Sequence, residues 1–140
     1  MLHDPATLGD ACARLRIRLL VLFGSHAGGA PAPGPDSDVD LAIAYQRGAP
    51  VPPFRDLFAA LSEAFPDRTP DPVHLPDADP LFRWEILRRG RLLYGDVDDF
   101  LEYRAFAYRD FVDSADLRRL EEVLFEKKMA YVRERLDAAS

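Results

Sequence analysis

Residues 17–25 read IRLLVLFGS and residues 38–45 read DVDLAIAY. The apolar part of each segment is short, mixes β-branched residues with leucine, and borders a polar turn, which is typical of a strand buried on both faces. We therefore expect strands at 17–23 and 39–45. Segments with helical spacing lie around them, so the sequence indicates an α/β (α+β) protein with a small mixed β-sheet and packed helices.

Spacing and turn signals predict further elements on both sides of these strands. Residues 71–75 (DPVHL) are short and flanked by proline, which cannot donate a backbone hydrogen bond, so they are expected to form an edge strand. Gly90 follows a run with helical spacing and is expected at C′, just past the end of that helix. The expected helices are 6–16, 54–65 and 80–89, followed by two C-terminal helices that begin near 97 and 114.

The composition indicates a single domain. The chain has 140 residues, of which 48% are hydrophobic, enough for one core but not for two. We expect a single domain at 1–140, with its core at about 5–95 and a C-terminal helical extension at about 96–140. The only cysteine, Cys12, falls on the apolar face of the first helix and is expected to be a packing residue rather than a nucleophile.

Charge and hydropathy exclude several classes of partner. The formal net charge is -6, which disfavours binding to a phosphate polyanion, so nucleic acid is not expected as the main partner. No apolar run is long enough to span a membrane, and the first residues do not resemble a secretion signal. We therefore expect a cytoplasmic protein without a membrane partner.

Two aspartates at the start of the second strand form the candidate metal site. Asp38 and Asp40 are two positions apart, which places both carboxylates on one face of a strand. Neighbouring carboxylates repel each other and raise each other's pKa, so such a pair usually needs a cation, and oxygen ligands suit Mg²⁺. Asp71 begins the edge strand and would supply a third carboxylate if that strand lies beside the second one in register.

Other interpretations of these acidic residues are available. A calcium loop that begins at Asp36 fails, because Leu41 stands where such a loop needs glycine and Arg47 stands where it needs glutamate. A solvated loop explains the acids but not their position directly before an apolar strand. The third carboxylate has nearby competitors, since aspartates are common in proline-rich turns. They are Asp67, Asp77 and Asp79.

Gly24-Ser25 forms a turn directly after the first strand. Backbone N–H groups and a hydroxyl at such a turn can face an anion, which indicates a possible phosphate site. The signal is weak alone, because glycine often follows a strand simply as a turn residue and no P-loop motif is present. Its combination with Asp38 and Asp40 is more specific.

These residues resemble the minimal nucleotidyltransferases (MNT family) of the polymerase-beta-like superfamily. The resemblance covers roughly residues 19–95 and rests on Gly24-Ser25, on SDVDLAIAY (37–45), on DPVHL (71–75) and on DPLFRWEILRRGRLLYG (79–95). It implies a polymerase-beta-like nucleotidyltransferase fold with C-terminal helices.

The resemblance also implies roles for the site residues. Gly24 and Ser25 would hold the nucleoside triphosphate, Asp38 and Asp40 would hold Mg²⁺, and Asp71 would complete the metal site or activate the acceptor hydroxyl. The substrate would be ATP, from which AMP is transferred. Many relatives are MntA-type antitoxins of MntA/HepT pairs, and the best-understood ones transfer AMP to a tyrosine of a HepT-type toxin.

Two alternatives to this function remain open. The chain could be a non-catalytic antitoxin that neutralises its partner by direct binding, or an adenylyltransferase that acts on a small molecule. Phe100, Phe106 and Phe111 of the first C-terminal helix are expected to pack in the core, whereas Tyr103 and Tyr108 are candidates for the surface. Apolar side chains of the second helix follow the same helical spacing and either pack on the sheet or bind the partner. They are Leu117, Leu120, Leu124, Met129, Val132 and Leu136.

The chain differs from many relatives in its phosphate turn. Where those relatives have Gly-Ser-x-Ala-Arg-Gly, residues 24–29 read GSHAGG, so an expected basic residue is absent at Gly28. The loop 29–35 is slightly longer than usual. Elsewhere, a cluster of arginines is interpreted as a solvated helix end, with approach to phosphates as the alternative. The cluster consists of Arg83, Arg88, Arg89 and Arg91.

Overall fold

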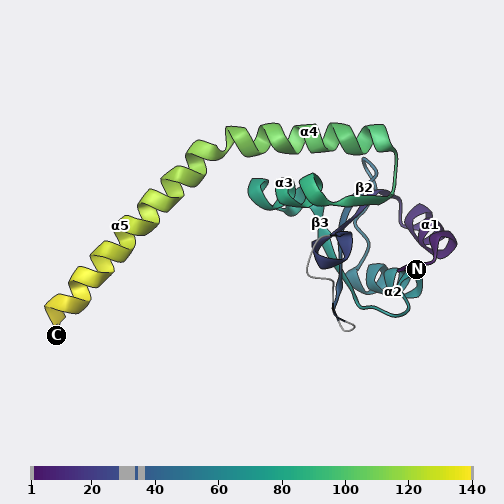
Figure 1. Ribbon diagram of the computed structural model, residues 1–140, viewed down its shortest axis with the longest axis horizontal. Helices are drawn as coiled ribbons and strands as arrows, with labels where there is room; N and C mark the ends of the chain where they lie inside the picture. Colours follow the sequence, from purple (N-terminus) through teal and green to yellow (C-terminus); the bar gives the residue numbers. More distant parts are fainter. Residues whose placement is uncertain (1, 29–33, 35–36, 140) are drawn as a thin grey trace.

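The computed structural model describes residues 2–28, 34 and 37–139. The expectation of a lengthened loop at 29–35 and the test of Asp36 as a calcium ligand lie outside these residues, apart from Gly34. A four-stranded sheet has two helices packed on each face, and the C-terminal helix extends away from it (Figure 1). Its elements are α1 (Pro5–Arg14), β1 (Ile17–Phe23), the 3-10 turn η1 (Gly24–Ala27), β2 (Val39–Tyr45), α2 (Phe54–Ala64), β3 (Pro70–His74), the 3-10 turn η2 (Leu75–Asp77), α3 (Pro80–Arg89), β4 (Arg91–Tyr94), α4 (Val97–Asp113) and α5 (Ala115–Ala139).

The sheet is mixed, as expected. The strand order is β3-β2-β1-β4, with β1 antiparallel to both β2 and β4, and with β2 parallel to β3. The two central strands have the predicted bounds and are almost fully buried, which explains their continuous apolar sequence. β3 lies at the edge of the sheet, where Pro72 costs no hydrogen bond to a second neighbour. The expected fold class is confirmed.

Side-chain alternation along the strands builds two core layers. Leu20 and Leu22 face α1 and α2, whereas Leu19 and Val21 face α3 and α4. Cys12 of α1 is fully buried in the first layer, and burial raises the pKa of its thiol to about 12. Such a thiol is a packing group, as the sequence predicts.

Gly90 ends α3, but not in the way expected of a C′ glycine. Its φ of -70° is open to any residue, so no left-handed conformation is needed. Instead, an added Cβ would lie 2.5 Å from the Ile86 carbonyl oxygen and 2.5 Å from Val21 Cγ1. Gly90 is therefore required for close approach, because it lets the end of α3 press directly against β1.

The two C-terminal helices behave differently from each other. α4 packs on the sheet through Phe100 and Ala107, and Asp99 at its start accepts two 2.5 Å hydrogen bonds from Arg18 of β1. The expectation that Phe106 is a core residue is wrong, since this side chain is 46% exposed.

α5 has no buried residue and extends away from the sheet and its helices (Figure 1). Of the two alternatives left open for the apolar side chains of the second C-terminal helix, packing on the sheet does not apply, because α5 buries none of them. Helical spacing reveals which side chains share a face of a helix, but not whether another element of the chain covers that face. In the part of the chain that the structure describes, no helix is long and apolar enough to cross a membrane.

Candidate active site

The strand register brings two of the predicted site residues together. Asp40 of β2 is the direct neighbour of Asp71 of β3 in the parallel pairing, and it also faces Phe23 of β1 across the antiparallel pairing. In-register neighbours point to the same side of a sheet, so both carboxylates lie on the face that carries α3 and α4. Asp38 precedes β2 by one residue and is exposed.

Like charges and burial act together on Asp40. Burial raises the pKa of the Asp40 carboxyl, and the nearby Asp71 and Asp38 raise it further, while His26 lowers it. Removing a carboxylate from water and placing another carboxylate beside it both disfavour the ionised form. A cation at this position would relieve both effects.

Gly24 packs directly on the Asp40 carboxylate. Its φ is +73°, which favours glycine, and an added Cβ would lie 2.1 Å from Asp40 Oδ2. No side chain fits between this turn and the carboxylate. The expected Gly24-Ser25 turn therefore lies at the end of β1, immediately beside Asp40 and Asp71, which together are called the acidic pair below.

His26 and Ser37 hold the segment before Asp38. The Ser37 hydroxyl donates a 2.7 Å hydrogen bond to the Gly34 carbonyl, so it accepts the 3.1 Å hydrogen bond from His26 Nε2. Arg68 Nη1 also donates to the Gly34 carbonyl, at 2.6 Å. The sequence gives no signal for this arrangement, because the partners come from three separate segments.

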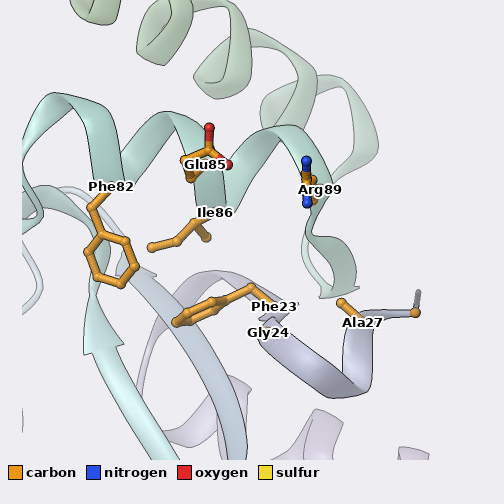
Figure 2. Close-up of a pocket in the computed structure, with 8 residues that line it drawn as sticks. Phe23, Gly24, Ala27, Phe82, Glu85, Ile86 and Arg89 are labelled. Carbon is orange, nitrogen blue, oxygen red and sulfur yellow. The ribbon is translucent and has the colours of Figure 1, made fainter. Parts of the chain in front are cut away.

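A cavity of about 290 Å³ opens between η1 and α3, next to Gly24 (Figure 2). Phe23 and Phe82 meet edge to face inside it, with ring centroids 5.8 Å apart. Figure 2 shows Arg89 of α3 across from Ala27 of η1. Sequence reasoning does not identify this cavity, because its walls come from elements far apart along the chain. The described residues that line it are Phe23, Gly24, Ala27, Gly28, Phe82, Glu85, Ile86 and Arg89.

The acidic residues fit a hard cation that takes further ligands from elsewhere. Among the described residues, no group of three or more His, Cys, Asp or Glu side chains is arranged to hold a metal ion by itself. Mg²⁺ is usually held by one or two carboxylates together with substrate phosphates rather than by a protein cage. The adjacent carboxylates of Asp40 and Asp71 suit this mode of binding.

A comparison of the sequence with models of protein families identifies the family. Residues 8–99 match the family model described as polymerase beta, nucleotidyltransferase. The chain belongs to this nucleotidyltransferase family. The match begins in α1 and ends at the start of α4, so it includes the whole sheet, the Gly24-Ser25 turn and all three aspartates. The expected superfamily and enzyme class are confirmed.

Solved structures share the fold of this nucleotidyltransferase. A chain of a toxin–antitoxin complex with AMP-PNP has a TM-score of 0.67 at 18% identity, over 90% of this chain and 98% of that chain. A chain of an MntA toxin–antitoxin mutant scores 0.66 at 15% identity, over 90% and 98%. A complex of a tri-AMPylated Shewanella oneidensis HEPN toxin with an MNT antitoxin gives 0.58 at 16% identity, over 90% and 99%.

These identities are low, so the likeness to solved structures establishes the fold alone. A sequence comparison with curated proteins finds no match to this nucleotidyltransferase.

Proposed function

We propose that this chain is a Mg²⁺-dependent adenylyltransferase that transfers AMP from ATP to a tyrosine hydroxyl of a HepT-type toxin and thereby acts as its antitoxin. The observation that carries this proposal is the contact between the Gly24 turn and Asp40, with Asp71 in register beside it. In a nucleotidyltransferase fold, a glycine turn in contact with a pair of carboxylates supports a site for a nucleotide and a metal ion. The reaction would take place in the cytoplasm.

The side chains have distinct roles in the proposed reaction. Asp38, Asp40 and Asp71 would hold Mg²⁺, which when bound neutralises phosphate charge during transfer. Asp71 stands on the edge strand, open to solvent, where an acceptor can approach. Within hydrogen-bond reach of the acceptor hydroxyl, it would take the proton as that oxygen attacks the α-phosphate and pyrophosphate leaves.

The Gly24-Ser25 turn would hold the triphosphate. Because an added Cβ at Gly24 would overlap the Asp40 carboxylate, the backbone at this turn comes closer to the acidic pair than any other residue type allows. A nucleotide lying along the turn would place its α-phosphate beside the carboxylates that hold the metal ion. Orientation of this kind is a large part of catalysis in phosphoryl-group transfer.

The solved relatives support the reaction and the partner. One complex contains AMP-PNP, another contains a tri-AMPylated HEPN toxin with an MNT antitoxin, and a third is a double Asp→Glu mutant whose two sites are two positions apart. That spacing is the spacing of Asp38 and Asp40. It supports the view that such an aspartate pair matters for function in this fold.

α5 favours a second function, in which the chain neutralises its toxin by contact. Its large apolar side chains are between 38% and 66% exposed, and they lie on a helix that touches little of the rest of the chain. We propose that this helix binds the toxin whether the chain acts by AMP transfer or by contact alone. In the first case, the extension at about 96–140 would bind the toxin, and the body at about 5–95 would modify it. The exposed apolar residues are Leu117, Leu120, Val123, Leu124, Phe125, Met129, Tyr131, Val132 and Leu136.

ATP that carries an isotope label in either the α- or the γ-phosphate distinguishes transfer of AMP from the alternative functions. With label in the α-phosphate, a HepT-type toxin incubated with this chain and Mg²⁺ should become labelled, and with label in the γ-phosphate it should not. Asp40→Asn should lower labelling by at least about a hundredfold to a thousandfold, because the metal site loses a charge. Asp67→Asn, an exposed aspartate outside the acidic pair, is the matched control and should label normally.

The other outcomes of this experiment are equally informative. Stable complex formation without label from either position would favour the contact antitoxin. Label that appears on a small molecule instead of the toxin would favour a small-molecule acceptor.

A further inference from the structure

The four arginines expected as one basic cluster have separate environments. Arg83 donates to the carbonyls of Leu75, Pro76 and Ala78 and pairs with Asp110, so it ties α3 to η2 and α4. Arg88 pairs with Glu85 at 3.0 Å. Within residues 2–28, 34 and 37–139, no hydrogen bond or ion pair engages the Arg89 guanidinium. Arg89 is also the arginine that lines the cavity beside Gly24.

The chain fixes the backbone of Arg89 firmly. The next residue, Gly90, approaches β1 so closely that a Cβ would overlap Val21 Cγ1 and the Ile86 carbonyl, and its N–H donates to that carbonyl at 2.7 Å. β1 continues from this contact into Phe23 and Gly24, which form the opposite wall of the cavity. A rigid contact thus sets the position of Arg89 relative to the phosphate turn.

The cavity carries an unbalanced positive charge, which favours an anionic ligand. In the part of the chain that the structure describes, no acidic side chain pairs with Arg89, while Glu85, which also lines the cavity, is paired with Arg88. The C-terminal end of α3 carries a partial negative charge that would repel a phosphate, and a cation in that last turn offsets it. The guanidinium fork is suited to bidentate binding of phosphate.

We propose that Arg89 binds the β- and γ-phosphates of the nucleotide in this cavity, taking the place of the basic residue absent at Gly28. This inference rests on the proposed function, which puts the α-phosphate beside Asp40. Gly24 touches Asp40 and also lines the cavity, so phosphates that extend from the α position enter it. A volume of about 290 Å³ lies at the lower limit for small-molecule sites, so the cavity suits part of a nucleotide rather than all of it.

Affinity for ATP and AMP in the presence of Mg²⁺ tests this role, measured by calorimetry with a non-hydrolysable ATP analogue. Arg89→Gln should weaken binding of the analogue by about tenfold to a hundredfold, because a charge-assisted contact is lost. Binding of AMP, which lacks the two outer phosphates, should change by less than about twofold. Arg89→Lys should recover part of the loss, since it keeps the charge but not the fork.

Arg55→Gln is the matched control, because it removes the same charge from an exposed position on α2. It should bind both ligands like the wild type. Equal loss of ATP-analogue and AMP affinity in Arg89→Gln, or no loss, would overturn the role of Arg89 and leave the proposed function standing. Failure of the wild type to bind the analogue would instead overturn both.

Discussion

The body of the molecule and α5 use apolar side chains in opposite ways. In the body, the strand residues Leu19 to Leu22 are fully buried between two layers of helices. In α5, leucines of the same size are more than half exposed, as at Leu117 and Leu136. The body therefore buries its apolar side chains through contacts within the chain, whereas α5 leaves exposed the apolar surface that we propose the toxin covers.

This contrast also separates rigid from adaptable positions. The carboxylate of Asp40 is fixed by strand register and by the contact with Gly24, so small backbone shifts there are expected to affect the proposed reaction. α5 is 25 residues long and depends on its own helix-forming residues and local pairs, such as Arg119 with Asp116 at 3.5 Å. We expect substitutions in the two regions to act on different measured quantities.

Among substitutions outside the three aspartates, the largest effect is expected from Gly24→Ala. The new Cβ overlaps Asp40 Oδ2 and the φ of +73° is strained for alanine, so AMP transfer should fall by about tenfold to a hundredfold. Gly48→Ala is the matched control, because Gly48 has a similar φ of +79° but nothing within 4 Å of an added Cβ. Both variants should lose roughly 1 to 2 kcal/mol of stability because alanine is strained in the left-handed region. Gly24→Ala should lose more than Gly48→Ala because its Cβ also overlaps Asp40, and only Gly24→Ala should lose activity. Equal activity in the two variants would contradict the proposed contact.

The double variant Leu120→Ala/Leu124→Ala should act on binding alone. Truncating two apolar anchors should weaken the complex with the toxin by at least about tenfold. The Tm of the isolated chain should stay within about 1 °C, because both side chains are exposed and alanine favours helix. Arg119→Ala/Glu126→Ala truncates two other exposed side chains of the same helix and should bind normally. A drop of several degrees in Tm would mean that Leu120 and Leu124 pack within the chain.

A smaller effect, on stability alone, is expected where α4 joins the sheet. The hydrogen bonds from Arg18 lower the pKa of Asp99, so the pair stabilises the fold above the unfolded pKa of about 4 and loses this contribution as the pH falls through the lower, folded value. Asp99→Asn should cost about 1 kcal/mol at pH 7, because the pair is partly exposed.

Urea unfolding at neutral and acid pH measures this contribution. The difference in the free energy of unfolding between the wild type and Asp99→Asn should be smaller at a pH of about 3 than at neutral pH. Asp98→Asn, next to it on α4, should show little difference at either pH. A difference that persists or grows in acid would contradict the role of the pair.

The sequence alone predicts the body better than the extension. The strands at 17–23 and 39–45 are predicted to the residue, because burial on both faces leaves a continuous apolar run bounded by polar turns. The neighbouring positions of Asp40 and Asp71 are expected but depend on a register that only the structure supplies. The exposure of Phe106 and of α5 is not predictable, since periodicity does not show whether an apolar face is covered.

Two features near the site also escape sequence reasoning. Arg89 differs from Arg83 and Arg88 only through tertiary contacts, which decide which arginine is paired and which faces the cavity. The contact of His26 with Ser37 joins η1 to the residue before Asp38, and no spacing rule links the two.

Native mass spectrometry of the toxin complex tests the central claim most directly, because it reports binding and AMP transfer together. After incubation with ATP and Mg²⁺, the wild-type complex should contain a toxin that is heavier by one or more AMP groups. Asp40→Asn should form the same complex with an unmodified toxin, which would assign chemistry to the sheet and binding to the rest of the chain. A toxin that still gains AMP in the Asp40→Asn complex would contradict the account.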